Sequence, residues 1–213
     1  MRIFVISDLH DDEYALLAAN KYVSTHQFDL VLVAGDITNR SVSYCEQLLA
    51  FFPDCLLIPG NNEPPSVMNF LKTKKNYIHE KRIEIGEALN IVGFGYSNVT
   101  SYGTPNEYRE QEIEKRMNKL RINSNTILLL HCPPFGYFDT VQETSIGSTA
   151  IRHSIEEKQP LIAIAGHVHE YEGIAQIGKT MFIKIATAQR YRAAEIKVIN
   201  KKVSVKSISI GDQ

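Results

Sequence analysis

The sequence has few cysteines, and it lacks any apolar run long enough to cross a membrane. Its three cysteines, Cys45, Cys55 and Cys132, form no Cys-x-x-Cys motif and no pairing pattern, which is typical of a reducing compartment. The N-terminal segment MRIFVISDLHDD has too short an apolar run for a signal peptide. We therefore expect a cytoplasmic protein that does not interact with a membrane.

The chain also lacks an excess of charge of either sign, since its formal net charge is -1. A general nucleic-acid binder usually carries a basic surface, so the composition argues against a nuclease that acts on long DNA. Linkers rich in Pro, Gly or Ser and internal repeats are also missing. With 213 residues, the chain is long enough for one well-packed core. We expect a single domain that covers residues 1–213.

Short apolar runs that stop abruptly at polar residues alternate with helical stretches along most of the chain. Continuous apolar runs of this length are typical of strands buried on both faces, and strands that alternate with helices predict a layered α/β core. The predicted strands are 3–6, 30–33, 55–58, 127–130 and 161–165, and the predicted helices are roughly 12–25, 41–52, 106–121 and 147–157.

The chain after residue 171 has a different pattern, in which short alternating apolar runs dominate. Asn200-Lys201-Lys202 is typical of a hairpin connection, so the C-terminal strands are expected to be antiparallel. Two mixed β-sheets packed as a sandwich, with helices on the outside, reconcile both parts of the chain. This α/β architecture is the fold class that we predict.

The predicted helix at 106–121 has a clear start signal. Thr104-Pro105-Asn106-Glu107 matches a capping box with Pro at the first helical position. Ile113, Met117 and Leu120 then fall on one face of the helix. We therefore predict that the helix begins at residue 106.

Polar side chains of one chemical kind follow five of the predicted strands. In open α/β sheets, ligands bind at the carboxyl ends of the strands. Each side chain has an ordinary alternative, since Asp8 and Asp36 are placed to cap the following helices, Asn61 suits a turn, and a single His131 is more often a core histidine. The joint pattern favours a metal site, because capping does not explain the histidines. The candidate ligands are Asp8, His10, Asp36, Asn61, His131, His167 and His169.

The kinds of ligand indicate which metals would bind. A mixed set of Asp, His and Asn favours Mn²⁺, Fe or Zn²⁺ over Mg²⁺ and Ca²⁺, because imidazole favours transition metals. Seven candidate ligands are too many for one tetrahedral ion, but they serve two ions if one carboxylate bridges, as in two-metal hydrolases. We expect two divalent transition-metal ions.

The ordered motifs resemble those of the calcineurin-like metallophosphoesterases, and in particular their small phosphodiesterase-like members. The resemblance extends over residues 8–169, and it implies a two-sheet sandwich that is flanked by helices. It also implies hydrolysis of small phosphodiesters or phosphomonoesters by attack of a metal-bridging hydroxide. The motifs are Asp8-x-His10, Gly35-Asp36, Gly60-Asn61, His131 and Gly166-His167-x-His169.

The same resemblance assigns ligands to each ion and makes Asp36 the bridge. It implies that one ion is held by Asp8, His10, Asp36 and His169, and the other by Asp36, Asn61, His131 and His167.

The sequence departs from many relatives at Asn62, where they have a histidine that is held to protonate the leaving oxygen. An amide donates a hydrogen bond, but it cannot supply a proton at accessible pH. An alternative to the enzyme is therefore a metal-binding scaffold or interaction protein of the same fold with little or no turnover. Glu63, His79 and His153 are other candidate acids, although we expect His79 and His153, like His26, to be ordinary surface histidines.

Two loops and two arginines are candidates for contacts to the substrate. Residues 96–105, which include Tyr102, and residues 135–149 are expected to approach the ions. Arg190 and Arg192 are further candidates to bind phosphate.

Overall fold

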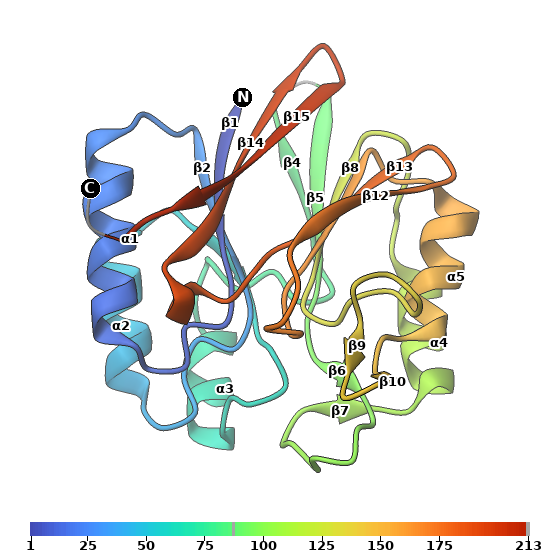
Figure 1. Cartoon of the computed structure of the whole chain (residues 1–213), viewed down its shortest axis with the longest axis horizontal. Helices are drawn as coiled ribbons and strands as arrows, with labels where there is room; N and C mark the ends of the chain where they lie inside the picture. The colour runs from blue at the N-terminus through green and yellow to red at the C-terminus, as the bar shows by residue number, and fades with distance from the viewer. Residues whose placement is uncertain (87, 212–213) are drawn as a thin grey trace.

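Two mixed β-sheets pack face to face, and helices cover the outer face of each sheet (Figure 1). The computed structural model describes residues 1–86 and 88–211. In Figure 1, helices α1, α2 and α3 lie on one side of the sandwich, and α4 and α5 lie on the other. The predicted α/β sandwich is confirmed.

The first sheet has the strand order β15-β14-β1-β2-β3. Strands β1, β2 and β3 are parallel, whereas β14 is antiparallel to both β1 and β15. The predicted hairpin connects β14 to β15. The strands are β1 (Arg2–Ile6), β2 (Leu30–Ala34), β3 (Leu56–Ile58), β14 (Arg192–Ile199) and β15 (Lys202–Ser209).

The second sheet has the strand order β12-β13-β11-β8-β5-β4. Strands β5, β8, β11 and β13 are parallel, and the two edge strands are antiparallel to their neighbours. The strands are β4 (Arg82–Ile85), β5 (Leu89–Phe94), β8 (Thr126–Leu130), β11 (Ile162–Ala165), β12 (Gly173–Ile177) and β13 (Thr180–Lys184).

The helices and short strands complete the fold. The helices are α1 (Glu13–Thr25), α2 (Val42–Phe51), α3 (Pro65–Lys72), α4 (Glu110–Lys119) and α5 (Thr149–Lys158), with the 3-10 helix η1 (Ala188–Arg190). Two small ribbons are formed by β6 (Ser97–Asn98) with β7 (Glu107–Tyr108), and by β9 (Thr140–Val141) with β10 (Thr144–Ser145).

The continuous apolar strands are explained by burial on both faces. In β1, Ile3 and Val5 belong to the core between the sheets, while Phe4 and Ile6 pack in the core under the helices. Successive side chains of a strand point to opposite faces, so a strand inside this sandwich needs apolar residues at every position. Ile113 and Met117 of α4 pack in a third core outside the second sheet.

One expectation about a helix needs correction, some elements were missed, and one alternative interpretation of Asp8 and Asp36 is excluded. The fourth helix begins at Glu110, because residues 107–108 form β7. The Glu107 carboxylate does accept a hydrogen bond from the Thr104 backbone N–H, but it stabilises a turn instead of a helix start. Helix α3 and strands β4 and β5 were missed. Neither Asp8 nor Asp36 caps a helix, since the N-cap residues of α1 and α2 are Asp12 and Ser41.

Within the described part of the chain, no helix combines the length and the apolar character that a membrane crossing requires.

The cap of α1 yields a first prediction. The Asp12 side chain accepts a hydrogen bond from the Ala15 N–H at 2.9 Å, so Asp12→Ala is expected to lower the free energy of unfolding by about 1 kcal/mol. Ser41 occupies the same position on α2, but within the described residues its side chain makes no cap hydrogen bond. Ser41→Ala is the matched control and is expected to change stability by less than about 0.5 kcal/mol. Urea unfolding measures both values, and equal effects of the two substitutions would contradict the assignment.

Candidate metal centre

The loops that follow the parallel strands adopt left-handed backbone conformations. The φ angles are 57° at Asp8, 47° at His10, 50° at Asp36 and 76° at His167. Such conformations are costly for residues other than glycine, and they cluster at functional sites. Glycine is required next to them at Gly35, where a Cβ atom would lie 2.6 Å from Nδ1 of His131. The strand ends therefore turn sharply and present polar side chains to one place.

Asp8, His10 and His169 form one group of possible metal ligands. One ligand atom from each residue lies within 4.8 Å of the others. Nε2 of His169 lies 3.5 Å from Oδ1 of Asp8, and Nε2 of His10 lies 3.1 Å from Nε2 of His169. Backbone N–H of His167 donates to the Asp8 carboxylate, which connects the first and last motifs of the sequence.

A second group contains Asp36, His131 and His167, whose ligand atoms also lie within 4.8 Å of one another. The side-chain oxygen of Asn61 lies 2.8 Å from Nε2 of His131. The backbone of β8 delivers His131, and the turn after β3 delivers Asn61. This group is therefore built from both sheets.

Asp36, a member of the second group, also faces the first group. Its Oδ2 atom is 3.6 Å from Nε2 of His10 and 3.5 Å from Nε2 of His131. This is the placement that a bridging carboxylate would need. The structure thus brings together all seven residues that were predicted as ligands.

Neighbouring groups orient the candidate ligands. Nδ1 of His131 is 2.8 Å from the carbonyl oxygen of Ala34, which makes Nδ1 the donor and leaves Nε2 to face the site. The amide of Asn61 donates to the Thr104 hydroxyl at 3.0 Å, so its oxygen points toward His131. Nδ1 of His10 is 3.1 Å from Oδ1 of Asn39. The sequence does not mark Asn39 and Thr104 as site residues, because their contacts with His10 and Asn61 form only when the chain folds.

One buried atom indicates that the group fits a metal ion. Nε2 of His167 is buried, and it has no hydrogen-bond partner among the residues that the structure describes. An unpaired buried polar group is costly. Its neighbours are carboxylates and imidazoles, the ligand types that divalent transition metals prefer. A metal ion would give this nitrogen a partner.

Two members of the second group have protonation states that suit a metal ion. Burial is the largest single influence on the pKa of Asp36 and raises it, but the charge of His131, a hydrogen bond from His131 and the charge of His10 together outweigh burial and lower the pKa to about 2. Burial lowers the pKa of His167 to about 3, with help from the charge of His131. Asp36 is therefore ionised and His167 neutral, as ligands must be.

Glu63 connects the two loops that carry Asp36 and Asn61. Its carboxylate oxygens accept hydrogen bonds from the backbone N–H of Ile37 at 2.7 Å and of Gly60 at 2.8 Å. Burial and the charge of Asp36 raise the pKa of Glu63 to about 8. Both oxygens face the backbone, so Glu63 positions the ligand loops and is not placed as a proton donor.

The other candidate acids lie apart from the metal groups. The expectation that His79 is a surface histidine is wrong, because only 8% of its side chain is exposed. Its Nδ1 accepts a hydrogen bond from the Gly95 N–H, and its ring stacks on Tyr96. Burial lowers the pKa of His79 to about 4. His26 and His153 are exposed, as expected.

Asn62 directly contacts the proposed bridge. Its backbone N–H and side-chain amide donate to the Asp36 carboxylate, the latter at 2.6 Å. Asn62 also lines a cleft of about 300 Å³ over the metal groups. The amide therefore adds a donor to the site, but no proton that it can release.

The walls of this cleft include parts of both predicted loops. Tyr102 and Thr104 come from the loop between β6 and β7, and Val141 and Ile146 come from the β9–β10 ribbon and its end. Glu170 also faces the cleft. Among the described residues that line it, none is Lys or Arg.

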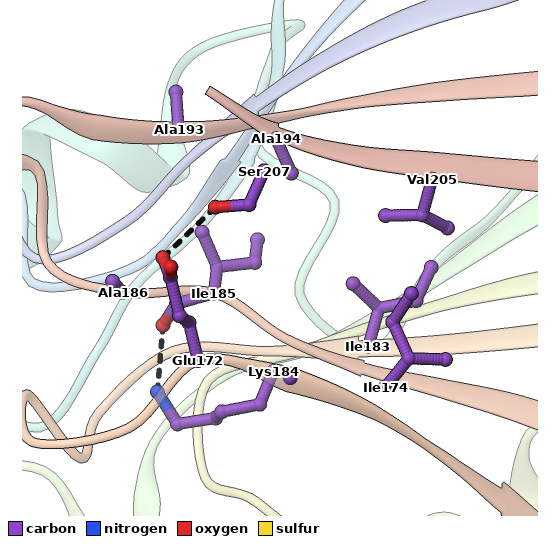
Figure 2. A pocket seen from close by; sticks show the side chains of 11 residues that line it. Glu172, Ile174, Ile183, Lys184, Ile185, Ala186, Ala193, Ala194, Val205 and Ser207 are labelled. Atoms are coloured by element: carbon purple, nitrogen blue, oxygen red, sulfur yellow. Dashed lines mark hydrogen bonds between the residues drawn. The ribbon is translucent and has the colours of Figure 1, made fainter. Parts of the chain in front are cut away.

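A second pocket of about 300 Å³ lies between the edges of the two sheets, at β12 and β13 on one side and β14 and β15 on the other (Figure 2). Lys184 is buried and lines the polar end of this pocket. Its Nζ donates hydrogen bonds to the carbonyl oxygens of Val168 and Ile185 at 2.6 and 2.7 Å. Val168 separates His167 from His169, so this lysine stabilises the loop that presents both. Arg192, which was a candidate for phosphate, pairs with Glu172 here.

Comparisons with known proteins find a matching family and similar chains. The family described as calcineurin-like phosphoesterase matches residues 1–171. An uncharacterised protein of Methanocaldococcus jannaschii is 34% identical over 194 residues, which cover 86% of this chain and 87% of that protein.

Two solved structures show the same fold at low sequence identity. A dimetal phosphatase from Danio rerio has a TM-score of 0.71 and 11% identity, with 99% of this chain and 96% of that chain covered. A structure described as a novel archaeal phosphodiesterase has a TM-score of 0.54 and 13% identity, with 98% of this chain and all of that chain (100%) covered.

Glu63 yields the second prediction. Glu63→Ala removes the acceptor for two buried N–H groups, and each unsatisfied group costs roughly 1–3 kcal/mol. We expect the free energy of unfolding to fall by about 3 kcal/mol or more, with Glu63→Gln intermediate because it keeps one acceptor oxygen. Glu46→Ala, at an exposed position on α2, is the control and should change stability by less than about 0.5 kcal/mol. Chemical denaturation of the metal-free protein tests this, and a Glu63→Ala variant as stable as the control would disprove the positioning role.

Proposed function

Since this chain belongs to the calcineurin-like phosphoesterase family, we propose that it is a dinuclear metal-dependent phosphoesterase that hydrolyses small phosphate esters. The observation that carries this proposal is the carboxylate of Asp36, which lies between two groups of metal-ligand side chains. A single-metal site would not need a second group on the far side of the same carboxylate.

We propose that Asp36 bridges two divalent transition-metal ions, with Mn²⁺, Fe and Zn²⁺ as the candidates. The histidine content of both groups supports this choice. The remaining ligands are proposed to be Asp8, His10 and His169 for one ion, and Asn61, His131 and His167 for the other.

Ions of this kind lower the pKa of water, polarise a phosphoryl group and hold both reactants for in-line displacement. The protein supplies position and charge. Glu63 and Lys184 fix the loops that present the ligands. Asn61 offers a neutral oxygen, so Asp8 and Asp36 are the only anionic ligands in the proposed set, and the centre keeps a positive charge that attracts an anion. Asn62 holds Asp36 through two N–H donors.

The cleft favours a monoanionic phosphodiester over a dianionic phosphomonoester. With two divalent ions, two carboxylates and a hydroxide, the centre carries about one net positive charge, which balances one negative charge. Glu170 adds a negative charge at the cleft, and the described lining contains neither Lys nor Arg to offset a second substrate charge. A volume of about 300 Å³ suits a small ester.

Metal binding and substrate charge are tested together. Mn²⁺ at a hundredfold excess over its Kd should stabilise the protein by about 2.7 kcal/mol, reversed by a chelator. The metal-loaded protein should hydrolyse bis(p-nitrophenyl) phosphate with a higher kcat/KM than p-nitrophenyl phosphate. Asp36→Asn is expected to remove the stabilisation and to reduce kcat at least about a hundredfold.

Asp54→Asn, at an exposed carboxylate far from the ligand groups, is the matched control and should retain both properties. A wild-type protein that neither takes up Mn²⁺ nor is stabilised by it would refute the dinuclear centre.

Asn62 supports an alternative function, a metal-binding scaffold with little turnover. The position carries an amide that already donates to Asp36 at 2.6 Å, and an amide cannot protonate a leaving alcohol. The enzyme therefore depends on esters whose leaving groups need no proton, such as p-nitrophenolate. The scaffold alternative predicts no turnover even for these esters.

Asn62→His distinguishes the two functions. General acid catalysis is worth about 10²–10⁴-fold, so the variant should raise kcat about a hundredfold for an alkyl leaving group and only a few-fold for p-nitrophenolate. Asn62→Ala is the control and should keep the steep dependence of the wild type on leaving-group pKa. The measurement is kcat over a series of leaving groups. Wild-type protein that binds Mn²⁺ but hydrolyses no member of the series, while Asn62→His does, would favour the scaffold.

A further inference from the structure

The metal cleft has one wall without metal-ligand side chains, formed by Tyr102, Val141 and Ile146. The side chain of Tyr102 is 63% exposed, although the burial of a large aromatic side chain is favourable. In Figure 1, the β6–β7 and β9–β10 ribbons that carry this wall lie together near the carboxyl ends of the second sheet. We call these three residues the apolar wall.

Hydrogen bonds connect Tyr102 to a proposed metal ligand through a short chain of side chains. The Tyr102 N–H donates to the hydroxyl of Thr100, and that hydroxyl donates to the Glu107 carboxylate. The same carboxylate oxygen accepts from the Thr104 hydroxyl, which in turn accepts from the Asn61 amide at 3.0 Å. The backbone at Tyr102, which carries the aromatic ring, is therefore linked to Asn61.

The other half of the apolar wall is also anchored. Oδ2 of Asp139 accepts hydrogen bonds from the backbone N–H of Gly136 and Gly147, which closes the segment that contains the β9–β10 ribbon. The side-chain amide of Asn98, at the end of β6 where the loop of Tyr102 begins, donates to the carbonyl oxygen of Gly147. Val141 and Ile146 are thus held next to the loop of Tyr102.

The apolar wall contributes no charged side chain to the cleft. The described lining contains no Lys or Arg, and Glu170 is anionic. The cleft therefore offers nothing to bind a second anionic group, and the apolar wall offers an aromatic ring and two branched aliphatic side chains. Stacking on an aromatic ring favours a flat, uncharged substituent.

We propose that Tyr102, Val141 and Ile146 determine specificity by binding a flat, uncharged aromatic substituent of the ester, such as an aryl group or a nucleobase. This inference rests on the proposed phosphoesterase function, because the phosphate is taken to lie at the metal centre. It adds the chemical class of the organic part of the substrate.

The test compares two esters with the same leaving group, bis(p-nitrophenyl) phosphate and methyl p-nitrophenyl phosphate, in the Mn²⁺-loaded protein. Tyr102→Ala should raise KM for the diaryl ester about tenfold and change KM for the methyl ester less than about twofold. Tyr102→Phe keeps the ring and should stay within about twofold of wild type. Val141→Thr makes the apolar wall more polar at nearly constant shape. It should also raise KM for the diaryl ester and leave KM for the methyl ester nearly unchanged.

Tyr14→Ala is the matched control, since Tyr14 is 76% exposed on α1 and does not line the cleft. It should change neither KM. A second readout is independent of turnover: diphenyl phosphate should raise the unfolding temperature of the wild type more than dimethyl phosphate does, and Tyr102→Ala should remove this difference.

The outcomes separate the two proposals. Equal losses for both esters in Tyr102→Ala, or no loss for either, would overturn the role of the apolar wall while leaving the esterase function intact. If the wild type hydrolyses neither ester, the phosphoesterase proposal fails. In that case, the role of the apolar wall stands if diphenyl phosphate still stabilises the wild type more than it stabilises Tyr102→Ala. The role fails if the two proteins are stabilised equally.

Discussion

The carboxylate of Asp36 is buried where the two sheets meet, and a buried negative charge is costly unless donors or positive charges surround it. The structure surrounds it with the two N–H donors of Asn62 and with His131, whose imidazole lies 3.5 Å away. Burial is the largest single influence on the pKa of His131 and lowers it, but the charges of Asp36 and Asp8 and the hydrogen bonds of the ring together outweigh burial and raise the pKa to about 9. Metal ions held by these side chains would supply the compensating positive charge in place of this proton.

The geometry of the centre depends on how parallel strands end. Strands β1, β2 and β3 deliver Asp8, Asp36 and Asn61 from the first sheet, and β8 and β11 deliver His131 and His167 from the second. The two sheets also share a hydrogen bond at this edge, between His131 and the carbonyl oxygen of Ala34. The packing of Ile and Val side chains between the sheets therefore sets the separation of ligands that belong to different sheets.

Much of this arrangement could be predicted from the sequence, because ligand-type residues followed buried strands in a repeated pattern. The sandwich and the convergence of all seven residues needed only that pattern and the resemblance of the motifs. The start of α4 was missed because Glu107 pairs with Thr104 in a turn, which has the same sequence signature as a helix cap. Lys184, Thr104 and the buried position of His79 were not predictable, since each depends on contacts between segments distant in the chain.

The hydrogen-bond chain from Tyr102 to Asn61 has a consequence for altering this protein by segment exchange. The loop of residues 100–107 contacts the metal-ligand segment through Thr104 and also through Asn106, whose backbone N–H donates to the carbonyl oxygen of Asn61. A loop grafted from a relative would therefore disturb Asn61 unless it retained equivalents of Thr104 and Asn106. Single substitutions at Tyr102 avoid this difficulty, because Tyr102 enters this chain of hydrogen bonds through its backbone N–H. Recognition of new esters is thus more accessible to point changes than to loop transplantation.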